Sequence, residues 1–205
     1  GSCLTYAQKT VLTDVHAGAR NSAGTAIYTS FPYDAGINGT SSSGWRSWKF
    51  SNALTRDPGA VAFIFTAPPV ANTSTFSDLS YALNFNMDVD APKIFGTNGT
   101  YTVAPMTFMT PPDPTNLSTL KNRGAKLIVY HGTSDPVFSF NDTARWYEGL
   151  QSANGGDASN FARLFPVPGM NHCSGGPATD QFDMVDAMVK WVEQGTAPAT
   201  VTATA

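Results

Sequence analysis

The sequence predicts an α/β protein with parallel strands, and three observations in its second half support this fold class. Continuous apolar runs at 125–132 and 161–169 have the length and β-branched content of buried strands. A helical pattern follows each run, at 142–154 and at 180–195. Strand, helix, strand and helix in tandem join parallel strands through crossover connections. Two strands alone do not make a stable sheet of this kind, so we expect this half to be the end of a larger sheet.

The expected helices carry their own start and stop signals. Near the N-terminus, Thr5 and Gln8 have the spacing of a capping box and precede apolar residues at helical intervals. A short helix before the first strand ends at Gly124, and the last helix ends at Gly195, where a C-terminal cap belongs. One apolar stripe is expected along that last helix, made of Phe182, Val185, Met188, Val189 and Val192.

The first half of the chain has a different character. From Gly18 to Asp90 the sequence is rich in loop-forming residues and carries many aromatic side chains, which suits a lid better than a central core. The apolar run at 60–69 is compatible with either a strand or a short helix. We therefore expect residues 1–114 to form a lid or substrate-recognition domain. Residues 115–205 are expected to form the C-terminal part of the α/β core.

Composition narrows the classes of function. A net charge of −3 with 13% charged residues gives no basic surface for nucleic acid, and no apolar run is long enough to cross a bilayer. The many Thr, Ser, Asn, Gly and Pro residues are typical of an exported protein, so we expect secretion or a periplasmic location. Asn-x-Ser/Thr triplets are found at Asn38, Asn72, Asn98, Asn116 and Asn141. Such triplets are acceptors for N-glycosylation, but polar loops also contain them by chance.

The two cysteines, Cys3 and Cys173, lie almost a chain length apart. The sequence alone is compatible with two free thiols, with one bridge between them, or with partners outside this chain.

Reactive residues follow both expected strands. Asp135 comes just after the first strand and His172 just after the second. Open α/β sheets place their active sites at the carboxyl ends of strands, and an acid followed by a histidine is the order found in α/β-hydrolases. An imidazole accepts a hydroxyl proton effectively only when its other nitrogen is held by an acceptor. We therefore predict that Asp135 orients His172 as a general base.

Other interpretations of these residues are weaker. Asp135 alone fits a Ser-Asp-Pro turn, and His172 alone fits a polar turn. A metal site from His131, Asp135 and His172 lacks a recognisable zinc spacing. Ser174 lies in His-Cys-Ser-Gly-Gly, but a nucleophile elbow requires glycine two residues earlier, where this chain has His172. We assign Ser174 to a turn and no nucleophile to this chain.

The stretches GAKLIVYHGTSDPVFSFNDTARWYE, ARLFPVPGMNHCSGG and KWVEQGTAP resemble the C-terminal part of the tannase and feruloyl esterase family. The resemblance implies an α/β-hydrolase fold with a large inserted lid, in which Asp135 and His172 are the triad acid and base. It places the serine upstream, in a Cys-Ser-x-Gly-Gly elbow whose cysteine pairs with the position of Cys173. It likewise implies an upstream partner for Cys3 and a structural calcium in the preceding part, with no cofactor held by this chain.

The resemblance also implies a substrate pocket. It places Trp48, Phe108, His131 and Phe138 around an aromatic acyl group of the feruloyl, galloyl or terephthaloyl type, although Trp48 and Phe108 also fit ordinary lid packing. The expected function is that of a serine carboxylic-ester hydrolase for aromatic esters. Its expected partners are a small aromatic ester and the N-terminal half of the enzyme, with no nucleic acid and no membrane. The alternative is a catalytically silent lid segment that recognises aromatic ligands or docks to its other half.

Overall fold

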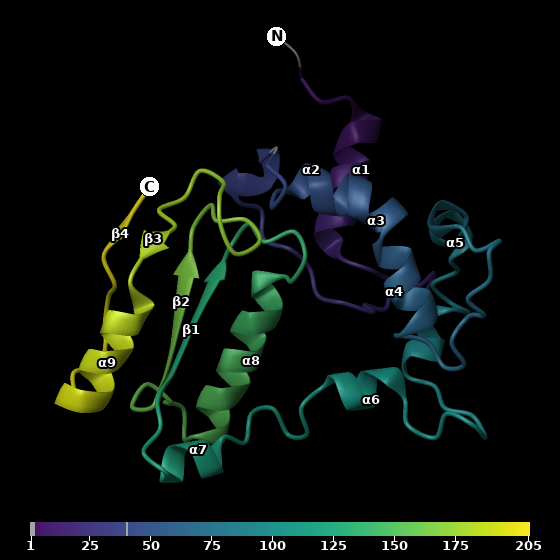
Figure 1. Cartoon of the computed structure of the whole chain (residues 1–205). Helices are drawn as coiled ribbons and strands as arrows, with labels where there is room; N and C mark the ends of the chain where they lie inside the picture. The colour runs from purple at the N-terminus through teal and green to yellow at the C-terminus, as the bar shows by residue number, and fades with distance from the viewer. Residues whose placement is uncertain (1–2, 40) are drawn as a thin grey trace. The chain divides into compact units, whose positions relative to one another are not determined.

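The computed structural model describes residues 3–39 and 41–205 (Figure 1). The described chain forms two compact units. The first contains the residues up to Ser30 together with Ser47–Pro112, and the second contains Phe31–Arg46 together with Asp113–Ala205. The roles expected for residues 1–114 and 115–205 stay predictions, and the segment Phe31–Arg46 clusters with the C-terminal residues.

The first unit is helical. Its elements are α1 (Tyr6–Ala17), the π-helical turn η2 (Trp48–Asn52), α3 (Ala53–Thr55), α4 (Asp57–Phe63), α5 (Asp78–Asn84), η3 (Ala91–Ile94) and α6 (Pro105–Met109); α2 (Trp45–Ser47) precedes η2. The capping box of α1 is confirmed, because Thr5 and Gln8 cap each other reciprocally. The apolar run at 60–69 is helical as far as Phe63 and then leaves the helix.

Aromatic packing holds α4 and α5 together in this unit. The ring of Phe76 lies 4.6 Å from that of Phe63 and 5.7 Å from that of Tyr81, measured between centroids. The Tyr81 ring in turn contacts that of Phe85 at 5.8 Å. Such tilted and edge-on contacts add to the free energy gained by burying the rings. These four aromatic side chains therefore pack within their own unit.

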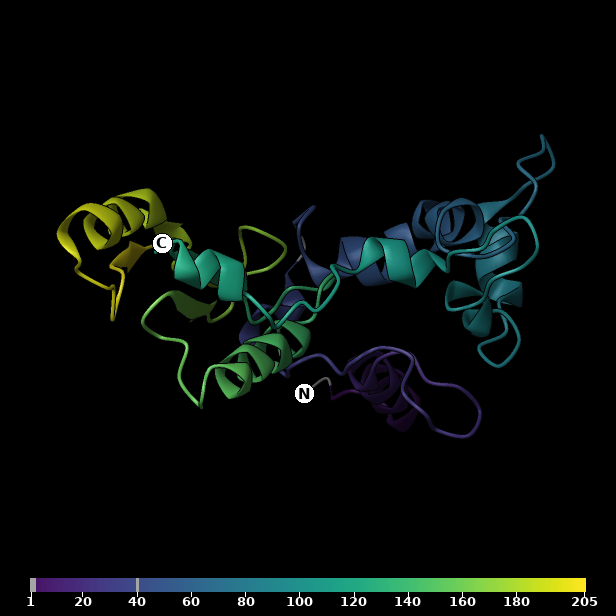
Figure 2. The ribbon, with the colours of Figure 1, turned by 90° about the horizontal axis from the view of Figure 1, so that it is seen from below.

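The second unit contains the parallel strands. Its elements are η1 (Ala35–Asn38), α7 (Ser118–Asn122), β1 (Leu127–Gly132), α8 (Phe140–Ala153), β2 (Ala162–Val167), β3 (Gln181–Phe182), α9 (Met184–Gln194) and β4 (Ala203–Thr204). β1 pairs with β2 in parallel from Leu127↔Ala162 to Gly132↔Val167, as predicted. α8 and α9 lie on different sides of the two strands (Figures 1 and 2). The mixed α/β class is confirmed.

The core of this unit lies under α8. Leu150, Ala158, Phe161 and Ala162 form a buried apolar cluster that is extended by residues of α7 and α8. The Tyr147 hydroxyl donates to the Ala162 carbonyl at 3.0 Å, which ties α8 to the start of β2. Helix and sheet are thus joined at the end of the strands opposite to the reactive loops.

Two expectations are wrong, one about the coverage of β1 and one about the start of the last helix. We expected β1 to be covered on both faces, but Tyr130 is 47% exposed, and the described sheet consists of β1 and β2. We expected Phe182 in the last helix, but Asp183 caps α9, so Phe182 falls in β3 and packs on Tyr130 with centroids 5.0 Å apart. The valines of the expected stripe are exposed, and Trp191 supplies the buried face of α9. The cap at Gly195 is confirmed, with a left-handed φ of 71°.

Cys3 and Cys173 are both free, exposed thiols. No helix among the described residues has the length and apolar character required to span a membrane.

Candidate active site

Two loops form the site, one at the carboxyl end of each parallel strand. The first runs from Thr133 to Asp135 after β1, and the second runs from Gly169 to His172 after β2. The loops pack closely, because a Cβ on Gly132 would lie 2.2 Å from the carbonyl oxygen of Met170. The Ser134 N–H also donates to that carbonyl at 3.1 Å. The backbones of the two loops are therefore in direct contact, close to Asp135 and His172.

The structure brings Asp135 and His172 together. Nδ1 of His172 lies 2.9 Å from Oδ2 of Asp135. The other carboxylate oxygen, Oδ1, accepts the backbone N–H groups of Val137 at 2.7 Å and Phe138 at 3.0 Å. Because Asp135 is only 3% exposed, its carboxylate is held in one orientation. A proton on Nδ1 directed at this acceptor leaves the lone pair on Nε2, so this nitrogen can act as a base.

The charge of Asp135 follows from its surroundings. Burial alone would raise the pKa of this carboxyl, since it disfavours the charged form. Hydrogen bonds from His131, His172 and the Val137 and Phe138 backbone outweigh that effect and lower the pKa below the ordinary value. Asp135 is therefore an anion at neutral pH and can stabilise a positive charge on His172. It also caps the turn that follows it, so the turn interpretation and the pairing with His172 hold together.

A second histidine shares the same carboxylate oxygen. Nε2 of His131 lies 3.3 Å from Oδ2 of Asp135, and Nδ1 of His131 lies 2.8 Å from the Thr143 hydroxyl. Because the ionised Asp135 only accepts, its contact with His131 requires a proton on Nε2, and a neutral ring then accepts the Thr143 hydroxyl at Nδ1. The sequence placed His131 at the pocket only by resemblance, and its contact with the acid was missed. The four-residue spacing between His131 and Asp135 does not predict this contact, because the chain must leave β1 and turn back before the two side chains meet.

The other expected pocket residues fall in different units. The Phe138 ring lies 5.6 Å from the His172 ring and is 61% exposed, so it offers an apolar surface beside the base. Trp48 and Phe108 belong to the first unit. There the Arg56 guanidinium lies 4.1 Å from the centre of the Trp48 ring, and Phe108 lines a cavity of about 330 Å³. Their place at a substrate pocket stays a prediction.

A third segment, from Phe31 to Arg46, lies beneath both loops and was not recognised from the sequence. Asp34 accepts the hydroxyl protons of Thr133 at 2.7 Å and of Ser134. The Trp45 indole N–H donates to the Ser134 carbonyl at 2.8 Å. The backbone N–H of His172 donates to the Ser43 carbonyl at 3.2 Å. No local pattern in the sequence links this stretch to the two loops, so its contacts could not be predicted.

The structure agrees with a turn for Ser174. Its side chain is exposed, and its carbonyl accepts the Ser43 hydroxyl at 2.9 Å. The preceding Cys173 has a left-handed φ of 64°, and its sulfur lies 3.9 Å from Nδ1 of His172. Across the described residues, no cluster of three or more His, Cys, Asp or Glu side chains is arranged to hold a metal ion.

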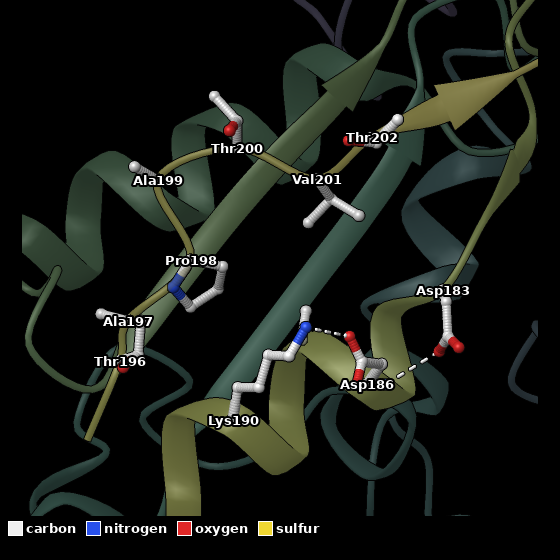
Figure 3. A pocket seen from close by; sticks show the side chains of 11 residues that line it. Asp183, Asp186, Lys190, Thr196, Ala197, Pro198, Ala199, Thr200, Val201 and Thr202 are labelled. Atoms are coloured by element: carbon white, nitrogen blue, oxygen red, sulfur yellow. Dashed lines mark hydrogen bonds and ion pairs between the residues drawn. The ribbon is translucent and has the colours of Figure 1, made fainter. Parts of the chain in front are cut away.

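A larger cavity of the second unit lies elsewhere. An open cavity of about 420 Å³ is lined by α9 and the tail from Thr196 to Thr202 (Figure 3). Its charged side chains have partners: Lys190 pairs with Asp186 at 2.7 Å, and Asp183 accepts the backbone N–H of Asp186 at 2.8 Å. Since neither Asp135 nor His172 lines it, we assign this cavity no part in the chemistry.

Comparison with known proteins places this arrangement in a family. A family model described as "Tannase and feruloyl esterase" matches residues 1–205. This chain belongs to the tannase and feruloyl esterase family. Mono(2-hydroxyethyl) terephthalate hydrolase of Piscinibacter sakaiensis is 41% identical over 215 aligned residues, covering 98% of this chain and 35% of that protein. Feruloyl esterase B of Aspergillus niger is 34% identical over 103 residues, covering 42% of this chain and 20% of its own.

Solved structures of tannases and feruloyl esterases share the fold. Tannin acyl hydrolase from Aspergillus niger matches with a TM-score of 0.64 at 18% identity, over 97% of this chain and 36% of that one. Feruloyl esterase B from Aspergillus oryzae matches with a TM-score of 0.56 at 23% identity, over 97% of this chain and 39% of that one. This member of the family thus spans little more than a third of the length of these structures.

Proposed function

We propose that this chain supplies the acid and the base of a serine carboxylic-ester hydrolase that acts on esters of aromatic acids. The observation that carries the proposal is the 2.9 Å contact between His172 Nδ1 and a buried, ionised Asp135. This is the geometry that prepares an imidazole to take a proton from a hydroxyl. The names of its relatives, hydrolases and esterases of aromatic acids, support the reaction class.

The mechanism uses a serine outside this chain. Nε2 of His172 takes the hydroxyl proton as the serine oxygen bonds to the ester carbonyl carbon, and backbone N–H groups beside the serine stabilise the oxyanion. The resulting imidazolium, held by Asp135, gives the proton to the departing alcohol as the ester C–O bond breaks. Water then attacks the acyl-enzyme with the same base. A chain that spans 35% of a relative's length leaves room for that serine in the remaining part.

The substrate class follows from the apolar surfaces near the base. The exposed Phe138 ring next to His172 suits a flat aromatic acyl group. We propose that Trp48 and Phe108 of the first unit also contact the aromatic acyl group, as the family resemblance implies. In this proposal His131 serves the pocket through its contact with Asp135, because its side chain is largely buried against that carboxylate.

The remaining features of the family are proposed on the same basis. The exposed thiols of Cys3 and Cys173 are available to partner cysteines outside this chain, that of Cys173 beside the serine. We assign a structural calcium to the preceding part of the enzyme and export to the protein as a whole.

Mass spectrometry of the natural protein under non-reducing conditions tests whether these cysteines form disulfides. A peptide containing Cys-Ser-x-Gly-Gly bridged to Cys173 supports the proposal, and an unmodified Cys173 contradicts it.

The catalytic assignment is tested by His172→Ala in the complete protein. Hydrolysis of a chromogenic aromatic ester should fall by roughly 10⁴-fold, since the loss of one triad member typically has that effect. Ser174→Ala is the matched control, because this exposed neighbour is assigned to a turn, and it should keep near wild-type turnover. Near wild-type turnover in His172→Ala would remove His172 from the mechanism. A wild-type protein that binds aromatic acids without hydrolysing their esters would favour the silent lid instead.

A further inference from the structure

The carboxylate of Asp34 is bound to the loop that carries the catalytic acid. Oδ2 accepts the Thr133 hydroxyl at 2.7 Å, and Oδ1 accepts the Ser134 hydroxyl and the Gly36 N–H, the latter at 3.2 Å. Thr133 and Ser134 directly precede Asp135 in the chain. Asp34 is therefore hydrogen-bonded to the residue next to the proposed catalytic acid, although about 100 residues separate the two acids in sequence.

The same group of contacts reaches the loop that carries the catalytic base. The Thr133 hydroxyl accepts the Gly169 N–H at 3.3 Å. The Gly36 carbonyl accepts the side-chain amide of Asn171 at 3.0 Å, and Asn171 directly precedes His172. The segment around Asp34 thus contacts the residue before the acid and the residue before the base.

The charge of Asp34 sets the direction of these hydrogen bonds. Burial would raise the pKa of this carboxyl, but hydrogen bonds from Ser134, Thr133 and nearby backbone N–H groups lower it overall. An ionised carboxylate only accepts, so both hydroxyls must donate to it. Their lone pairs then face the N–H groups of Gly36 and Gly169, which lie 3.0 Å and 3.3 Å away. One anion therefore orients two hydroxyls, and each hydroxyl binds a further piece of backbone.

The space around these contacts leaves little room for adjustment. A Cβ on Gly36 would lie 2.4 Å from the Gly169 carbonyl oxygen and 2.5 Å from the Ser134 side chain. Ser134 and Asn171 are both fully buried.

We propose that Asp34 is a positioning residue that clamps the two strand-end loops and so sets the contact between Asp135 and His172. This proposal rests on the proposed function only for its effect on turnover; its effect on the contact is independent.

The decisive substitution is Asp34→Asn in the complete protein. The amide has nearly the shape of the carboxylate, but its NH₂ group donates, so one of the two hydroxyls must turn away from residue 34. The Thr133 hydroxyl can turn to the Val167 carbonyl, 3.4 Å away, and either change disturbs the contact with Gly36 or Gly169. We expect the low-field NMR signal of the His172 Nδ1 proton, assigned by its absence in His172→Ala, to be lost or broadened in a folded protein. We expect kcat to fall roughly 10- to 100-fold, the effect of a small misplacement of catalytic groups, with KM little changed.

Asp157→Asn is the matched control. This exposed carboxylate also accepts a loop N–H, that of Ser159 at 2.7 Å, but it lies before β2, away from the site. It should leave both the signal and kcat unchanged. If Asp34→Asn does not fold, Thr133→Val removes one hydroxyl of the clamp and should weaken the signal on its own. A folded Asp34→Asn or Thr133→Val that keeps the signal overturns the clamp, and an inactive wild type with an intact signal overturns only the esterase proposal.

Discussion

At the scale of the residue, the site consists of one carboxylate shared by two imidazoles. Oδ2 of Asp135 accepts from His172 at 2.9 Å and from His131 at 3.3 Å. Each additional donor favours the ionised form, which agrees with the lowered pKa of this buried acid. His131 is therefore an electrostatic support of the acid, and this role suggests a test that separates it from a pocket wall.

Replacing His131 by leucine removes a donor that lowers the pKa of Asp135, so that pKa should rise. A carboxyl whose pKa is lower in the folded state stabilises the protein above its unfolded pKa, here 3.8, and that contribution is lost as the pH falls through the folded pKa. With a smaller shift, His131→Leu should have less stability at neutral pH and unfold at a higher pH during acid titration. His131→Gln, whose amide can still donate, is the control. Equal acid midpoints for the leucine variant and the wild type would contradict this role.

The sequence predicts a site residue when a local pattern marks it, and does not predict one whose partners lie far away along the chain. Asp135 and His172 were found because each directly follows a strand, and parallel strands bring their ends to one edge. Asp34 was not found, because nothing local links it to Thr133 and Ser134, 99 and 100 residues away. Its side chain is identified only by the folded contacts.

At the scale of the element, short-range signals were reliable and long-range burial was not. Thr5 with Gln8 and the left-handed Gly195 mark helix ends where they were expected, because capping is decided within one turn. The stripe on α9 was misjudged because the Asp183 cap shortens the helix and the β3–β4 pair takes Phe182. Which face of a helix is buried depends on neighbouring elements, and the local sequence does not define these.

The glycine that opens the second loop gives a prediction at this scale. Gly169 has a φ of +77°, and a Cβ there would lie 2.4 Å from the Pro177 carbonyl oxygen. Gly124 has a similar φ of +73°, with open space around it. Gly124→Ala should lower the free energy of unfolding by about 1 kcal/mol, the cost of a left-handed alanine, and leave activity intact. Gly169→Ala should lower it further and also reduce turnover, because the backbone bearing His172 must shift. Equal losses in thermal unfolding would show that the Pro177 contact is unimportant.

At the scale of the whole molecule, the second unit presents apolar side chains that a complete α/β core would cover. Tyr130 on β1 is 47% exposed, and Val185 and Val192 on α9 are 73% and 61% exposed. Exposed sheet edges and contiguous apolar surface promote association between chains. The chain also spans only 35% of the length of mono(2-hydroxyethyl) terephthalate hydrolase. Under the proposed function, the N-terminal part that supplies the serine should cover this surface.

The 205-residue chain produced alone should therefore bind a hydrophobic dye and self-associate in a concentration-dependent manner. Co-expression with the proposed N-terminal part should suppress both effects, because strands that it supplies would pair with the open edge of β1 and bury Tyr130. The double substitution Val185→Lys and Val192→Lys should also reduce association of the isolated chain, because it interrupts the exposed apolar surface of α9. Analytical ultracentrifugation distinguishes the cases. A monodisperse monomer with no dye binding would mean that these side chains need no cover, and that the two-strand sheet is sufficient by itself.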